Sequence, residues 1–173
     1  MKYNLTHRVL HYLIAIGVLF QFTKVLGRAD DGSVFYTIYE MIPSWHSSIG
    51  AIVMLLLIAK LIIIGIAKVS KSNPSYSAKR TVPVKIGHIA LNVILFAVPL
   101  TAMAFMVSKG YPLQIFGFEL LGYVDLSPSA DSFLRTVGSA HSPLSLALIV
   151  LVFGHIGFAI YHKIKKDPTS ISM

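Results

Sequence analysis

Four long apolar runs dominate the chain, and each is interrupted by few or no charged residues. They lie at about residues 8–26, 46–67, 86–107 and 143–162. A helix of about 20 apolar residues crosses the ~30 Å hydrocarbon core of a bilayer. The pattern therefore predicts an all-α fold, a transmembrane four-helix bundle.

The segments between the runs contain proline, glycine, serine and charged residues, which are typical helix breakers. None of them resembles a domain linker, so residues 1–173 are expected to form a single integral membrane domain. The longest, 108–142, is expected to fold over the outer end of the bundle. A cleavable signal peptide in the first run is the alternative, and it would leave three spans.

The composition narrows the chemistry that the chain can perform. Only 13% of its residues are charged and its mean hydropathy is +0.72, whereas soluble domains are about 25% charged. Because the chain has no cysteine, it cannot form disulfides, iron–sulfur clusters or the thioether links of c-type haem. Any redox centre must therefore be held without a covalent link.

The formal net charge is +8, and the distribution of the basic residues between the two sides of the membrane indicates the topology. Cytoplasmic segments collect Lys and Arg, and the side that carries both termini has ten of them, whereas the other has four and six of the seven acids. We therefore expect a multi-pass protein of the bacterial inner membrane with both termini in the cytoplasm. No basic patch interleaved with aromatic residues remains to indicate nucleic-acid binding.

Four of the seven histidines fall on a pattern that predicts two pairs. His141 and His155 are 14 residues apart in the fourth run, which puts them on one helix face and ~21 Å apart along its axis. His46 begins the second run at the outer end, and His11 lies near the inner end of the first. The pattern predicts that His46 meets His141 and that His11 meets His155.

A buried pair of imidazoles without a carboxylate suits an iron porphyrin, which leaves two axial positions to the protein. Zinc would require three or four protein ligands, and no Asp, Glu or Cys lies inside a span. Small residues near the pairs, Gly50, Gly154 and Gly157, fit a flat macrocycle between helices. A haem-free transporter or scaffold that uses the histidines for protons is an alternative.

With these features the chain resembles the bacterial cytochrome b561 family over its whole length. The matching stretches are Arg8–Tyr12, Pro43–Gly50, Gly87–His88, Phe96–Leu100, Gly154–Gly157 and Tyr161–Asp167. The resemblance implies that His11, His46, His141 and His155 are the axial ligands of two b haems.

The resemblance also implies an oxidoreductase. Some members are similar to superoxide:ubiquinone oxidoreductases, which pass electrons from a donor outside the membrane to a quinone within it. Superoxide or another one-electron donor, such as a redox protein, is therefore the expected reductant and ubiquinone the expected acceptor. The alternative is a membrane-anchoring cytochrome b subunit of a larger dehydrogenase or hydrogenase.

Three further residues lie near the expected inner haem. Lys60 follows His46 by 14 residues, so it shares that helix face at the inner depth and is expected to pair with a haem propionate; snorkelling to the membrane surface is the alternative. His88 and His162 are candidates for quinone binding or proton supply, because quinone reduction consumes protons. Both are otherwise ordinary interfacial residues. The sequence does not determine the donor, the quinone or the oligomeric state.

Overall fold

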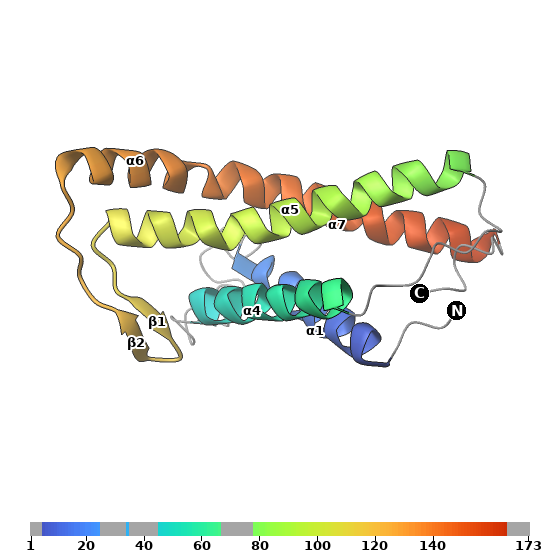
Figure 1. Ribbon diagram of the computed structural model, residues 1–173, viewed down its shortest axis with the longest axis horizontal. Coiled ribbons are helices and arrows are strands. Elements are labelled where there is room, and N and C mark those ends of the chain that lie inside the picture. The colour runs from blue at the N-terminus through green and yellow to red at the C-terminus, as the bar shows by residue number, and fades with distance from the viewer. Residues whose placement is uncertain (1–4, 25–33, 35–44, 67–77, 166–173) are drawn as a thin grey trace.

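The computed structural model describes residues 5–24, 34, 45–66 and 78–165, and its helices form an elongated bundle with one short hairpin (Figure 1). α1 packs on α4, α5 packs on α6 and α7, and α4 contacts α5. The predicted all-α membrane bundle is confirmed. In chain order, the elements are α1 (Leu5–Gln21), α4 (Trp45–Ile66), α5 (Ala78–Ser108), β1 (Leu113–Ile115), β2 (Phe118–Leu121), α6 (Pro128–Ser139) and α7 (His141–Ile164).

Three helical stretches in the described part of the chain are long and apolar enough to cross a membrane. They are Trp45–Ile63, Lys85–Ser108 and Pro128–Ile164, and α1 is a shorter apolar helix of 17 residues. The first span was expected to reach residue 26, but α1 ends at Gln21. α5 begins eight residues before the expected start at residue 86. Three of the four expected spans thus match helices of spanning length with shifted ends, whereas the first matches the shorter helix α1 and stays a prediction.

The apolar core lies at mid-depth, between the two histidine levels. Leu148 is seven residues from both His141 and His155, which is ~10 Å along the helix axis in either direction. A small cluster of buried apolar side chains therefore separates an outer from an inner level. The buried core residues are Ile14, Val18, Val53, Leu57 and Leu148.

Two glycines allow particular helices to approach closely. A β-carbon at Gly17 of α1 would lie 2.5 Å from a side-chain methyl of Val53 in α4, and one at Gly138 of α6 would lie 2.7 Å from the Cα of Phe105 in α5. Larger residues would force these helices apart. The tight contacts thus join α1 to α4 and α5 to α6, whereas α7 does not pack closely on α1 or α4 in the described residues.

A hairpin covers the outer end of α4, as expected for segment 108–142. β1 and β2 pair antiparallel with Ile115 opposite Phe118, and the turn residues Phe116 and Gly117 both have positive φ, 48° and 83°, which is typical of a type I′ turn. The Phe116 N–H donates to the Oγ of buried Ser48, 2.8 Å away. This bond holds the turn against the first turns of α4.

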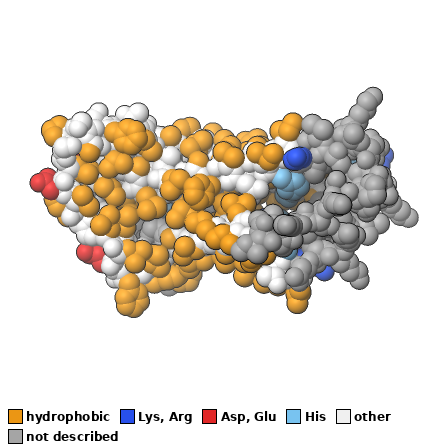
Figure 2. Space-filling model, viewed as in Figure 1, with side chains coloured by type: hydrophobic (Ala, Val, Ile, Leu, Met, Phe, Trp, Pro, Cys, Tyr) orange, Lys and Arg blue, Asp and Glu red, His pale blue; other side chains and the backbone are white. Residues whose placement is uncertain are grey.

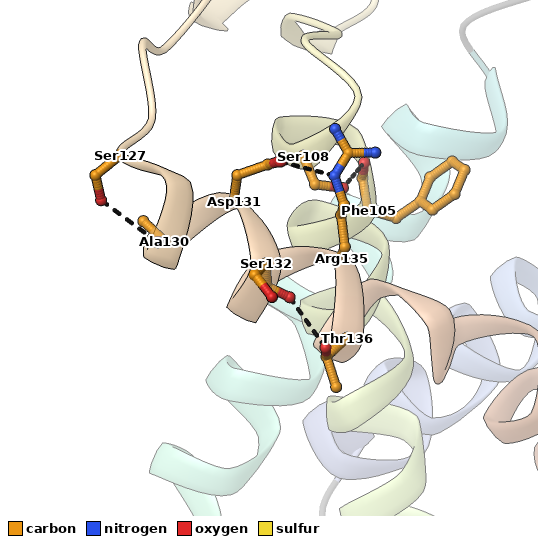
Figure 3. Close-up of polar contacts among 8 residues, drawn as sticks. All are labelled: Phe105, Ser108, Ser127, Ala130, Asp131, Ser132, Arg135 and Thr136. Carbon is orange, nitrogen blue, oxygen red and sulfur yellow. Dashed lines mark hydrogen bonds and ion pairs between the residues drawn. The ribbon is translucent and has the colours of Figure 1, made fainter.

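α6 was not predicted, although its start has a readable signal. The Ser127 side chain caps the helix by accepting from the Ala130 N–H, and Pro128 occupies the first turn. Arg135 pairs with Asp131 one turn earlier at 2.8 Å (Figure 3). α7 follows after Ala140 alone and begins at His141, two residues before the expected start at residue 143.

The described surface matches the expected placement in lipid. On the face in view, hydrophobic side chains cover the middle of the molecule, acidic groups lie at the end that carries α6 and the hairpin, and Lys, Arg and His side chains lie at the opposite end (Figure 2). The described acidic residues are all in the outer segment, at Glu119, Asp125 and Asp131. This distribution agrees with the charge sorting in the sequence.

Candidate functional site

The predicted outer pair of histidines comes together. His46 lies in the first turn of α4, and His141 begins α7. Both side chains are half-buried, their ring centroids are 6.4 Å apart, and their ring planes are 85° apart. Two helices that do not pack closely on each other thus present imidazoles across the space between them.

The tautomer of His141 follows from its hydrogen bond. Its Nδ1 lies 3.0 Å from the backbone carbonyl oxygen of Val98 in α5. Because a carbonyl can only accept, Nδ1 carries the proton and donates it, which leaves the lone pair on Nε2. A metal-ligating histidine is typically held in this way by its second nitrogen.

The backbone beside His46 is also held in place. The side-chain Nε2 of Gln21, at the end of α1, donates to the His46 carbonyl oxygen at 2.8 Å. A β-carbon at Gly50 would lie 3.1 Å from the same nitrogen, so the small residue leaves room for this bridge. Gly50 was expected to make space for a macrocycle. In the structure, its lack of a side chain also leaves room for the Gln21 side chain.

The predicted inner pair also comes together. The rings of His11 in α1 and His155 in α7 have centroids 6.4 Å apart and planes 69° apart. Both side chains are half-buried. Beside His155, β-carbons added at Gly154 and Gly157 would meet no atom within 4 Å. Both glycines are exposed, so this open space lies at the surface of α7, and their role beside a macrocycle stays a prediction.

The ring separations fit an iron atom between each pair. A bond of ~2 Å from metal to imidazole nitrogen, with the nitrogen ~1.15 Å from the ring centre, gives centroids about 6.3 Å apart when the two bonds are collinear. Both pairs have this separation. Among the described residues, no three His, Asp or Glu side chains come together to hold a bare metal ion. A porphyrin iron, which requires two protein ligands, suits this donor set better than zinc.

His88 lies beside the inner pair. It is ten residues from the start of α5, because the helix begins at Ala78 and not near residue 86. Its ring centroid lies 5.3 Å from that of His155, with the planes 74° apart. The rest of the side chain is exposed.

His162 lies at the far end of α7. Its ring packs on Phe158 at 4.2 Å and on Tyr161 at 5.4 Å between centroids. These contacts are with neighbours on its own helix. The structure therefore brings His88 to the inner pair directly, whereas the recorded ring contacts of His162 are local.

Lys60 lies at the inner level, as its spacing predicted. The side chain is half-buried and lies near His7, His11 and His155. The acidic side chains that the structure describes are all at the other end of the molecule. Lys60 is therefore placed to interact with an anionic group at the inner pair.

Comparisons with known proteins agree with this site. Residues 2–173 match the family described as prokaryotic cytochrome b561. The chain is 29% identical over 171 residues to cytochrome b561 homolog 2 of Escherichia coli strain K12, covering 97% of this chain and 88% of that protein. It is 24% identical over 179 residues to cytochrome b561 homolog 1 of the same organism, covering 99% and 96%.

Proposed function

We propose that this chain, which belongs to the prokaryotic cytochrome b561 family, binds two haems and carries single electrons across the bilayer. Its family membership makes it a multi-pass membrane protein that transfers electrons through b-type haem. The donor is a one-electron reductant at the outer side, with superoxide as the leading candidate. The acceptor is a membrane quinone, with ubiquinone as the candidate. The cytoplasmic membrane, with both termini inside, is the proposed location.

The observation that carries this proposal is the equal spacing of two histidine pairs at two depths. His46 and His141 would hold the outer haem, and His11 and His155 the inner one. When bound, two b haems supply reversible one-electron chemistry at both levels. If each pair holds one haem, its two histidines would leave the iron no open position for a stable oxygen ligand. The arrangement favours electron transfer over oxygen binding.

The overall reaction balances for superoxide as donor. Two superoxide ions lose one electron each and become two molecules of O₂. One quinone takes up the two electrons together with two protons and becomes a quinol. Because each b haem would take up a single electron, the electrons would pass one at a time.

The quinone site is proposed to lie at the inner level. His88 is exposed beside His155, and His162 lies at the inner end of α7 among aromatic side chains. An imidazole near the membrane surface is a suitable proton donor to a reduced quinone. Both residues are therefore candidates for proton supply.

The direct test is an optical spectrum of the purified full-length protein with a haem-to-protein ratio. We expect reduced-minus-oxidised b-type bands, two haems per chain and rapid reduction by superoxide in a stopped-flow instrument, followed by reoxidation with ubiquinone. A colourless protein after haem-supplemented expression would contradict the proposal. Two haems that superoxide fails to reduce would contradict the donor alone.

Substitution of Lys60 by glutamine is expected to lower the midpoint potential of the inner haem. A positive charge favours the electron-rich reduced state, and its removal near a partly buried site changes the energy by on the order of 1 kcal/mol at an effective dielectric constant of ~20, which is some tens of millivolts. Lys60→Arg keeps the charge and serves as the matched control. Potentiometric titration measures both variants. An unchanged potential in Lys60→Gln would show that the lysine instead snorkels to the membrane surface.

An exposed apolar surface favours a second candidate, the membrane-anchoring subunit of a larger dehydrogenase or hydrogenase. All four residues of β2 are exposed, and Phe118 and Tyr123 are 78% and 76% exposed. Apolar side chains beyond the spanning segments can mark a protein interface. Copurification with a soluble redox subunit, together with no reduction of the isolated protein by superoxide, would favour this candidate.

A further inference from the structure

Helix α5 contributes no histidine to either pair, yet it contacts the α7 member of both. The Val98 carbonyl oxygen lies 3.0 Å from Nδ1 of His141. The ring of His88 lies 5.3 Å from the ring of His155, measured between centroids. The two α7 histidines thus have corresponding neighbours on the same adjacent helix, one a backbone group and the other a side chain.

The His88–His155 separation does not suit a metal between the two rings. Two imidazoles on one iron have centroids about 6.3 Å apart, as in the two predicted pairs, whereas 5.3 Å is too short by about 1 Å. A direct contact between a ring N–H and the nitrogen of the other ring, ~3 Å apart, gives centroids about 5.2 Å apart. The separation therefore fits a direct contact in which His88 lies edge-on to His155.

We propose that His88 is a positioning residue for the inner haem, acting through His155 as the Val98 carbonyl acts through His141. A nitrogen of the His88 ring accepts a hydrogen bond from the N–H of His155, which is carried by the ring nitrogen that does not face His11. This interaction orients the imidazole plane and turns its other nitrogen toward His11. The inference rests on the proposed function, because it assumes that His11 and His155 hold a haem.

Such an acceptor has two consequences for a haem iron. It increases the electron density on the ligand, which favours the oxidised iron and lowers the midpoint potential. It also fixes the angle between the two axial imidazole planes, which determines the anisotropy of the low-spin EPR signal. A proton donor to quinone would affect neither property when no quinone is bound.

The test uses full-length protein in detergent without quinone, with His88→Phe as the main variant. Phenylalanine keeps an aromatic ring but cannot accept a proton. We expect two haems per chain, an upward shift of one of the two midpoint potentials, and a change in one of the two low-spin EPR signals. The outer haem acts as an internal reference, since its partner is a backbone carbonyl that the substitution leaves in place.

Two further variants make the result specific. In His88→Gln the side-chain carbonyl can still accept, so both the potential and the EPR signal should return toward those of the unmodified protein. His162→Phe, on α7 itself, should change neither. Loss of one haem in His88→Phe that His88→Gln restores would also support the positioning role.

Three outcomes would overturn the inference. Unchanged potentials and EPR signals in His88→Phe would do so, and if quinone reduction then falls, His88 acts only in proton supply. Loss of one haem from both His88→Phe and His88→Gln would show that the acceptor in glutamine does not substitute for His88. Hydrogen-bond acceptance would then not be the role of His88. Fewer than two haems in the unmodified protein would contradict the proposed function itself, and the inference with it.

Discussion

Substitution of His141 by alanine is expected to remove one of two haems from the purified protein. The outer haem would lose one of its two axial ligands, His141, whose Nε2 lone pair is made available by the hydrogen bond from Nδ1 to the Val98 carbonyl oxygen. Haem bound through His46 alone would be far weaker, because the fold holds it without a covalent link. The measurement is the haem-to-protein ratio, with reduced-minus-oxidised spectra before and after substitution.

The matched control for this experiment is His162→Ala. It removes a histidine from the same helix, but one whose recorded ring contacts are with Phe158 and Tyr161. This variant should keep both haems. If His141→Ala also retained two haems, the assignment of the outer pair would be wrong, and a ratio of one in the control would indicate general instability of α7.

Substitution of His11 by alanine is expected to stop quinone reduction while leaving the outer haem reducible. His141 and His155 lie ~21 Å apart along α7, and electron tunnelling slows exponentially with distance. Without the inner haem, an electron would have to cross this span in one step. We expect quinol formation in proteoliposomes to fall to the level of protein-free vesicles, with optical reduction of one remaining haem preserved.

His7→Ala is the control for that variant. His7 lies one turn before His11 on α1 and also lies near Lys60, but it belongs to neither pair. It should retain two haems and most of the quinone reduction. Normal quinone reduction in His11→Ala would contradict the proposed order of transfer, since electrons would then reach the quinone without the inner site.

Both histidine pairs could be predicted from the sequence because their depth depends only on local helix geometry. A rise of 1.5 Å and a period of 3.6 residues place His141 and His155 on one face and at two levels, and the charge distribution orients the neighbouring helices. His46 then lies at the depth of His141, and His11 lies at the depth of His155. The ring contacts agree with this placement.

The neighbours of the pairs could not be predicted in this way. The Val98 carbonyl carries no side-chain signal, and Gln21 reaches His46 only because α1 ends at that level. The hairpin consists of strands of three and four residues, too short for a clear alternation of apolar and polar positions. Phe116 adopts a positive φ that its residue type disfavours, and the Ser48 bond from another part of the chain holds it there.

The sequence by itself therefore determined the number of apolar runs, the relative heights of His141 and His155 on one helix, and the chemistry that remains when cysteine is absent. Only the tertiary structure decided which side of α5 faces α7, and hence that His88 lies against His155 and the Val98 carbonyl against His141. The physical reason is that residue spacing specifies height and face within one helix. The rotation of one helix against another depends on packing among all of them, including the close approach that glycines such as Gly17 allow.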